Sequence, residues 1–220
     1  MNKKGTVRIG QKHRRGIAGD KSSNCVGFKN IDVTSGSFNK IGGVEAKTLS
    51  PFKVGPVIDK NGLQAELFEN YWQGGKLWPK AGHIKEGTGN MPSDKWFQFR
   101  EKVYSMKKGK RRPLPLKQYG FPTCAYYNDI PYGYIDSRKD IYIPIYYELI
   151  KNLPVIQEMK KLLDNGVNIM IIDGDGPPKN IYPEGLEITQ ENWNLMVEDT
   201  TYPFGHGYVV AGLLSGLLND

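Results

Sequence analysis

The sequence contains only two cysteines, Cys25 and Cys124, among its 220 residues, and they form no C-x-x-C pair. This scarcity argues against a scaffold held by disulfides and against a zinc site built from cysteines. It also favours a reducing environment, so we expect an intracellular, cytoplasmic protein. No apolar run approaches the roughly 20 residues that a membrane-spanning helix requires. We therefore expect no membrane contact, and the basic N-terminal stretch lacks the apolar core of a secretory signal.

Basic charge is concentrated in the first two thirds of the chain. The net charge is +7, but residues 150–220 hold four Lys or Arg and ten Asp or Glu, which leaves +13 on the first 149 residues. Part of this charge lies in residues 1–24. A second cluster consists of Lys107, Lys108, Lys110, Arg111 and Arg112. Such clusters suit the phosphates of a nucleotide or a nucleic acid, although they can also serve solubility alone. The second cluster is our candidate for phosphate contact.

The order of apolar and turn-forming residues predicts an α+β fold. We expect a flexible basic arm over residues 1–24 and a single, mostly helical domain with a small β-sheet over residues 25–220. Short strands and loops are expected over residues 25–58, and a long loop over 107–133. A buried strand running into a tight acidic turn is expected over 167–178.

Five segments have the pattern of helices. Two of them have clear boundary signals, a capping serine at Ser93 and a stop at Gly166, while Pro144 predicts a kink or a division in a third. The expected helices run from Leu63 to before Pro79, from Ser93 to about Lys107, and over residues 135–152, 155–165 and 205–218.

The stretch FENYWQGGKLWP, Phe68–Pro79, places polar groups among aromatic ones. Successive residues of a helix are about 100° apart, so Glu69, Gln73 and Lys76 would share one narrow face, with Trp72 at its edge. If this face points inward, its groups must be paired or bind a ligand, because an unpaired buried charge is costly. If it points to solvent, Glu69 and Lys76 form an ordinary surface pair.

Two adjacent glycines, Gly74 and Gly75, interrupt the same stretch. Each interior glycine costs a helix about 1 kcal/mol relative to alanine. Glycine permits a ligand or another element to approach the backbone closely, and it also commonly ends a helix. Both interpretations of the pair are open at this point.

Further candidates follow in the C-terminal half. Asp173 and Asp175, in IIDGDGPP, come after the buried strand, where they could share acid–base duty or simply form an Asx-turn. His206, between two glycines, is either a phosphate contact at a helix start or a structural histidine. Arg138 and Lys139 either bind a phosphate or form ion pairs at a helix start. We take Asp173 as a catalytic candidate and the other four as substrate contacts, and we assign no metal site.

The block E-N-Y-W-Q-G-G-K-L, Glu69–Leu77, resembles the E-H-Y-F-Q-A-x-K-F signature of the NADAR (YbiA-like) family. Glu69, Tyr71, Gln73 and Lys76 are identical to the signature, and a tryptophan stands at its aromatic position. The LSPFKVGPV segment upstream and the KLLDNG segment downstream are also similar to blocks of that family. The chain lacks the family's W-G-x-G segment and carries an insertion over residues 79–135, as expected of a divergent member.

The resemblance implies a YbiA-like fold and an N-glycosidase that hydrolyses a ribose–base bond in a nucleotide-like or ADP-ribosylated substrate, without a cofactor. In such a reaction Glu69 would act as general acid or base, and Lys76 as nucleophile or electrostatic stabiliser. Gln73 would orient substrate hydroxyls, and Trp72 would stack on a base or pack in the core.

Two other functions fit the same residues. One is a nucleic-acid-binding protein without catalysis, which would use the basic arm and the cluster at residues 107–112. The other is a glycosyl or ADP-ribosyl transferase acting on DNA, with the same pocket and a different acceptor. A binding protein gains little from a buried Glu69 and Lys76, so the location of that helix face distinguishes the classes.

Overall fold

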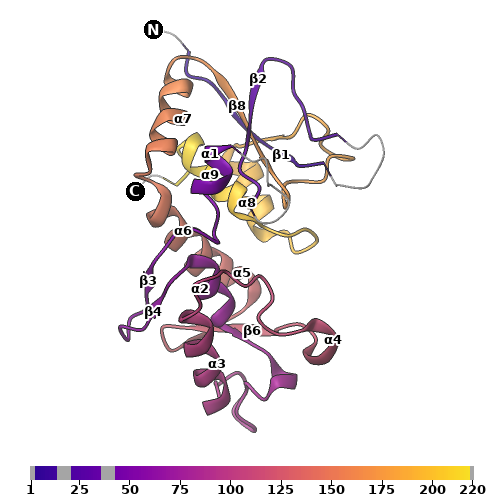
Figure 1. Ribbon diagram of the computed structural model, residues 1–220. Coiled ribbons are helices and arrows are strands. Elements are labelled where there is room, and N and C mark those ends of the chain that lie inside the picture. The colour runs from indigo at the N-terminus through magenta and orange to yellow at the C-terminus, as the bar shows by residue number, and fades with distance from the viewer. Residues whose placement is uncertain (1–2, 14–20, 36–42, 219–220) are drawn as a thin grey trace. The chain divides into compact units, whose positions relative to one another are not determined.

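The computed structural model describes residues 3–13, 21–35 and 43–218. It has an α+β fold of helices and small sheets (Figure 1). The chain forms two compact units: unit 1 consists of Met1–Ser50 and Tyr146–Asp220, and unit 2 of Pro51–Ile145. Unit 2 is thus one continuous segment inserted between the two parts of unit 1. None of the helices in the described ranges is long and apolar enough to cross a membrane.

Unit 1 is built on a four-stranded sheet with the order β2-β8-β1-β9. These strands are β1 (Val7–Gln11), β2 (Phe28–Asp32), β8 (Asn168–Asp173) and β9 (Leu186–Glu187). Both β1 and β2 pair in parallel with β8, while β9 is antiparallel to β1. The apolar side chains of β8 are almost completely buried, as its continuous run of branched residues requires of a central parallel strand. The predicted buried strand is confirmed.

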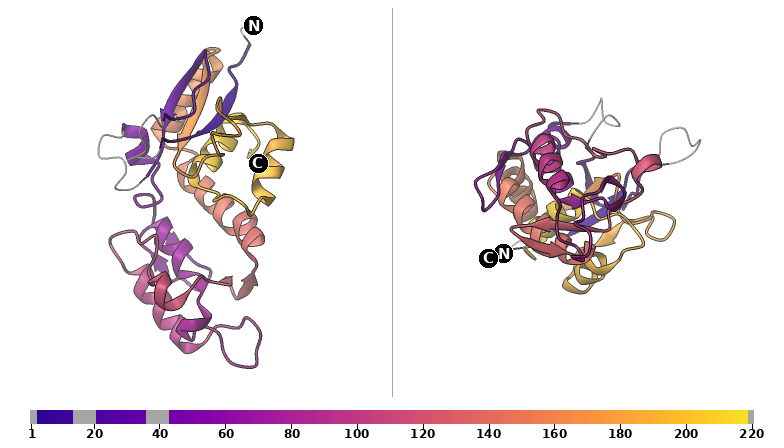
Figure 2. Two further views of the ribbon diagram at one scale, coloured as in Figure 1. Left: turned by 90° about the vertical axis from the view of Figure 1, so that its right-hand side faces the viewer. Right: turned by 90° about the horizontal axis from the view of Figure 1, so that it is seen from below.

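Unit 1 also contains helices. They are α1 (Val44–Thr48), α7 (Pro154–Asp164), α8 (Gln190–Glu198) and α9 (His206–Ser215). Helix α9 contacts β1 and β8, and α7 packs against β8 and α9 (Figure 2). The helices predicted over residues 155–165 and 205–218 are confirmed. Gly166 and Gly216 follow their C-termini with φ angles of 82° and 85°, a left-handed conformation that favours glycine.

One expectation about the chain's organisation is corrected, and a second stays a prediction. Val7–Gln11 do not belong to a flexible arm, because they form β1 between β8 and β9 in the sheet. Val7 and Ile9 are buried, so the apolar residues of VRIGQ outweigh the basic residues around them. The rest of the predicted arm lies partly outside the described residues. The single domain expected over residues 25–220 stays a prediction, while the contacts divide the chain into two units.

Unit 2 combines short helices with two small antiparallel sheets, β3-β4 and β5-β6-β7. Its elements are β3 (Val57–Ile58), β4 (Gln64–Ala65), α2 (Phe68–Gly74), β5 (Lys76–Leu77), the 3-10 helix η2 (Pro79–Ala81), α3 (Asp94–Tyr104), α4 (Leu116–Tyr119), β6 (Cys124–Tyr127), β7 (Ile130–Tyr132), α5 (Tyr134–Ser137) and the π-helix η3 (Arg138–Tyr142). Helix α2 packs against α3. Helix α6 (Ile143–Ile150) begins in unit 2 and continues into unit 1.

The structure refines three of the predicted segments in this region. The helix expected from Leu63 is limited to Phe68–Gly74. The expected loop over residues 107–133 contains α4 and the hairpin β6-β7, whose turn is made by Asn128 and Asp129 with positive φ angles. Around Pro144 the chain stays helical, and a π-helical turn precedes the proline, whose missing N–H and bulky ring disturb the regular hydrogen-bond pattern.

Candidate functional site

The polar face of α2 points inward. Gln73 Nε2 donates a hydrogen bond to Glu69 Oε1 at 2.9 Å, and Lys76 Nζ donates one to Gln73 Oε1 at 3.0 Å. Only 6% of Glu69 and 7% of Gln73 is exposed. The three groups therefore form one hydrogen-bonded chain, and the interpretation as a surface ion pair is wrong. Lys76 joins the face although it belongs to β5, because only one residue, Gly75, separates it from the end of α2.

The glycine pair makes room for two tyrosine rings. A Cβ atom on Gly74 would lie 2.7 Å from Tyr104 Cε1, and one on Gly75 would overlap the Tyr127 ring. Gly75 also forms the C-cap of α2, with an ordinary φ of −71°. The glycines thus let another element approach the backbone and end the helix, and what lies against them is the aromatic core. The prediction that they leave room for a ligand is not needed to explain them.

Trp72 belongs to both the core and the site. Its ring is parallel to that of Tyr127, with centroids 6.1 Å apart, and Tyr142 packs edge-on against it at 5.0 Å. Lys76 Nζ lies 4.8 Å from the centroid of the Trp72 ring. A cation at this distance is attracted by the face of the indole ring. The same contact holds the Lys76 amine against the Trp72 ring.

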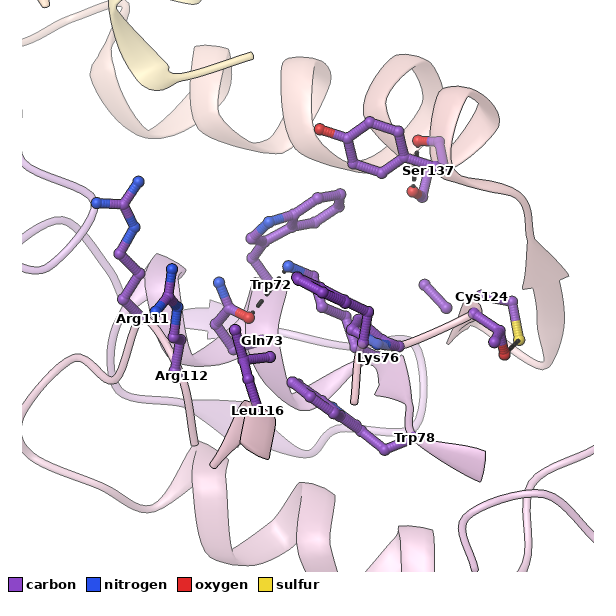
Figure 3. Close-up of a pocket in the computed structure, with 14 residues that line it drawn as sticks. Trp72, Gln73, Lys76, Trp78, Arg111, Arg112, Leu116, Cys124 and Ser137 are labelled. Atoms are coloured by element: carbon purple, nitrogen blue, oxygen red, sulfur yellow. Dashed lines mark hydrogen bonds between the residues drawn. The ribbon is translucent and has the colours of Figure 1, made fainter. Parts of the chain in front are cut away.

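Lys76 lies on a cavity of about 320 Å³ within unit 2 (Figure 3). The volume falls in the range of small-molecule sites. Aromatic rings and cations dominate the lining, and none of the described residues that line it is Asp or Glu. The lining residues are Trp72, Gln73, Lys76, Trp78, Arg111, Arg112, Leu116, Phe121, Pro122, Thr123, Cys124, Ala125, Tyr134 and Ser137. This combination suits a ligand with a flat ring and an anionic group.

Burial lowers the pKa of Lys76 to about 8. The charge of Glu69 acts in the opposite direction and raises this pKa, while the positive charge of Arg111 lowers it further. A lysine in water has a pKa near 10.4 and is almost entirely protonated at neutral pH. Lys76 instead carries an appreciable fraction of neutral amine there, which is the form that attacks a carbon atom.

This pKa predicts an unusual dependence of stability on pH. The unfolded chain holds the Lys76 proton up to about pH 10.5, whereas the folded chain releases it near pH 8, so the contribution of Lys76 to the free energy of unfolding grows as the pH rises between these values. We expect wild type to gain on the order of 2 kcal/mol relative to Lys76→Met between about pH 7 and pH 10. Urea denaturation of both proteins measures this difference, and a constant difference over that range would contradict the lowered pKa.

Asn70 holds the segment that contains the basic cluster at residues 107–112 next to α2. Its Nδ2 donates to the carbonyl oxygen of Met106 at 2.7 Å, and its Oδ1 accepts from the N–H of Lys110 at 3.0 Å. The side chain is completely buried. This explains how Arg111 and Arg112, which follow directly, come to line the cavity. Asn70 stands where the NADAR signature has histidine, so this position has a local structural role here.

Only part of the predicted phosphate cluster reaches the cavity. Arg111 and Arg112 line it, but Lys107, Lys108 and Lys110 do not. Lys107 forms an ion pair with Glu66, at 2.8 Å.

Two other predicted contacts do not line the cavity either. Arg138 is almost completely buried in η3, with its guanidinium carbon 4.6 Å from the centroid of the Tyr134 ring. Its neighbour Lys139 is exposed. Arg138 therefore contacts the lining residue Tyr134 without lining the cavity itself, and its predicted role as a substrate contact is not supported by this position.

Asp173 and His206 lie in unit 1, where they join strand ends to α9. Asp173 Oδ1 accepts from the N–H of Gly174 at 2.7 Å, and Oδ2 accepts from the N–H of Gly207 at 3.0 Å. His206 Nδ1 lies 3.4 Å from Asp173 Oδ2, and His206 Nε2 donates to the carbonyl oxygen of Val33 at 2.7 Å. Both side chains are buried.

These contacts are those of a capped helix start, because a carboxylate accepts a backbone N–H at the positive end of α9. They account for Asp173 and His206 without a ligand. Asp175 packs beside Gly205 at the same helix start. The predicted catalytic set is thus divided: Glu69 and Lys76 come together in unit 2, and Asp173 belongs to unit 1.

Sequence reasoning missed most of the aromatic wall. Trp78, Phe121 and Tyr134 line the cavity, together with Cys124 and Ser137. For Phe121 and Cys124 the available signal was the long loop predicted over residues 107–133, which does not indicate which of its residues face a cavity.

Comparison with known proteins gives no match: no family model fits the sequence, and neither a curated protein nor a solved structure matches it. The similarity of Glu69–Leu77 to the NADAR signature therefore stays a resemblance. Within the parts of the chain that the structure describes, no three His, Cys, Asp or Glu side chains gather in a way that could hold a metal ion.

Proposed function

We propose that unit 2 is an N-glycosidase that hydrolyses the bond between a ribose and a base in a nucleotide-like or ADP-ribosylated substrate. The observation that carries this proposal is the amine of Lys76, which borders an aromatic cavity with a pKa lowered to about 8. An amine of this kind is a nucleophile at physiological pH. The resemblance of Glu69–Leu77 to the NADAR signature supports the same reaction.

In the proposed reaction, neutral Lys76 Nζ attacks C1′ of the ribose. The C1′–N bond breaks, its electron pair stays on the base nitrogen, and the proton released by the new Lys76–C1′ bond passes to that nitrogen. The C1′–O4′ bond then breaks, O4′ takes its electron pair and the remaining proton of the amine, and a Schiff base is left between Lys76 and C1′. Water then adds to C1′ and the amine departs, so that the overall reaction is hydrolysis. A transferase would replace this water by an acceptor in the same cavity.

The surrounding residues have supporting roles in this scheme. Arg111 and Arg112 bind a phosphate of the substrate, and the rings of Trp72 and Trp78 contact its base. Glu69 does not line the cavity, and a hydrogen-bonded chain through Gln73 links it to Lys76. We therefore revise its predicted role from general acid or base to that of a positioning residue, which holds the Gln73 amide with its oxygen toward Lys76.

The proposal is tested by incubating the full chain with nucleotides derived from NAD, phosphorylated riboflavin precursors and ADP-ribosylated DNA. Mass spectrometry should detect a released base. Borohydride, which reduces a Schiff base to a stable amine, should attach a ribose-derived mass to the peptide that contains Lys76. Absence of base release from every substrate class, or release without trapping at Lys76 and with full activity of Lys76→Ala, would overturn it.

Two charge changes are expected to shift the pH profile in opposite directions. Glu69→Gln removes a charge that raises the pKa of Lys76, so the rise of kcat/KM with pH should move to lower pH. Arg111→Ala removes a charge that lowers this pKa, so the rise should move to higher pH. Glu66→Gln, which neutralises a carboxylate paired with Lys107, is the matched control and should leave the profile in place. Shifts of the same sign for Glu69→Gln and Arg111→Ala would contradict this account.

A further inference from the structure

The entire net charge of the protein resides in unit 2. Residues 51–145 contain 16 Lys or Arg and 9 Asp or Glu, a net charge of +7, which equals that of the whole chain. The remaining residues are balanced, with 14 of each sign. Because a local excess of positive charge attracts polyanions, the charge favours a partner with more than one phosphate on the unit that holds the cavity.

Two large aromatic rings lie exposed at the cavity. Phe121 is 75% exposed and Tyr134 is 47% exposed, yet both belong to the lining. They come from different segments, the loop that follows α4 and the first residue of α5. Exposed flat rings beside cations are the means by which proteins bind single-stranded nucleic acids, since successive bases stack on the rings while cations follow the phosphates.

Two further lysines belong to the segments next to these lining residues. The Lys80 side chain lies beside Gly120, the residue that precedes Phe121 in the chain. Its Cδ is 3.9 Å from the position that a Cβ on Gly120 would occupy. Lys117 is exposed on α4, next to the lining residue Leu116. Together with Arg111 and Arg112, these lysines provide more positive charge than one phosphate group requires. We call this surface, formed by Lys80, Arg111, Arg112, Lys117, Phe121 and Tyr134, the cavity mouth.

We propose that the cavity mouth binds a single-stranded polynucleotide. One nucleotide enters the cavity, its neighbours stack on Phe121 and Tyr134, and the phosphates between them contact the cations of the mouth. In a duplex the bases are stacked on one another, so they are not accessible for stacking on the exposed rings. A mononucleotide fills the cavity but makes no contact with the cavity mouth. The inference rests on the cavity of the proposed function as the nucleotide site, but it concerns binding and is measured without turnover.

Fluorescence anisotropy tests this with the full chain and a labelled single strand of about 12 nucleotides, a length within the site sizes of known single-strand binders. The same sequence is tested as DNA, as RNA and as a duplex. We expect at least one single strand to bind about tenfold more tightly than the duplex, and a free mononucleotide to compete poorly. Equal affinity for the single strands and the duplex, or no binding at all, would overturn the proposal even if base release is observed.

Variants separate the mouth from general attraction by charge. The double variant Lys80→Glu/Lys117→Glu should weaken binding about tenfold and reduce the dependence of log K on log salt by about 1.4, at ~0.7 for each phosphate contact. Phe121→Ala removes the ring on which a base would stack and should weaken binding about tenfold. Phe121→Trp keeps a flat ring at this position and should retain binding. Lys102→Glu, on the exposed face of α3, is the control with the same type of charge change. Equal weakening by Lys102→Glu and by the single variants Lys80→Glu and Lys117→Glu would refute a specific site.

Discussion

Replacing Lys76 by alanine is expected to lower kcat for base release by about 1000-fold or more, the range seen when a group that acts directly in the reaction is removed. The amine that would attack C1′ borders the cavity and donates a hydrogen bond to the side-chain oxygen Oε1 of Gln73 at 3.0 Å. Single-turnover measurements on the best substrate of the panel report this effect on chemistry. Nucleotide affinity, measured by calorimetry, should change far less, because Arg111 and Arg112 remain.

Lys76→Arg distinguishes the two predicted roles of the lysine. The variant keeps a positive charge beside Trp72, but its guanidinium does not deprotonate and cannot form a Schiff base. If Lys76 is the nucleophile, Lys76→Arg should be as inactive as Lys76→Ala. Substantial activity of the arginine variant would instead assign Lys76 as an electrostatic stabiliser, and would remove the covalent step from the scheme.

Gly75→Ala is expected to reduce the free energy of unfolding by about 3 kcal/mol or more, at the upper end of the overpacking range. The added Cβ would overlap the Tyr127 ring and lie 2.6 Å from its hydroxyl oxygen. The ring cannot simply move away, since Tyr127 Oη donates to the carbonyl oxygen of Trp72 at 2.7 Å. Because the φ of Gly75 is −71°, alanine fits its backbone conformation, and the whole effect is steric. Urea denaturation measures it.

Gly133→Ala is the matched control for this prediction. Gly133 also has an ordinary φ, −64°, and the nearest atom to an added Cβ is a carboxylate oxygen of Asp136 at 3.2 Å, at the end of a flexible side chain. Its change in stability should stay below about 1 kcal/mol. Combining Gly75→Ala with Tyr127→Leu should cost less than the sum of the single changes, because both act on the same contact. Full additivity would contradict the steric explanation.

The arrangement of the candidate site was best predicted from the sequence where it depends on the spacing of residues along a single helix. Glu69, Gln73 and Lys76 are separated by four and three residues, and this local spacing alone predicts a shared face. Whether that face points inward depends on the packing of Trp72 against Tyr127 and Tyr142, residues 55 and 70 positions away, which no local pattern reveals. The same limit explains why Phe121 and Tyr134 were missed as walls of the cavity.

Long-range pairing also explains the misplacement of the N-terminal strand. VRIGQ is short and lies among basic residues, so its local composition indicates an arm. Its partner in the sheet is β8, more than 150 residues later, and the burial of Val7 and Ile9 depends on that pairing. Helices α7 and α9, by contrast, were predicted well, because their periodicity and the glycines after their last turns are local signals.

The insertion of unit 2 gives the chain a modular design. All four strands of the sheet in unit 1 come from outside residues 51–145, so the sheet is complete without the segment that holds the cavity. The hydroxyl of Tyr146 donates to the carbonyl oxygen of Leu49, which joins the two ends of unit 1 at the point where the insertion leaves and returns. A short connector could therefore close this gap at little entropic cost. The segment that holds the cavity is accordingly separate in sequence from every strand of this sheet.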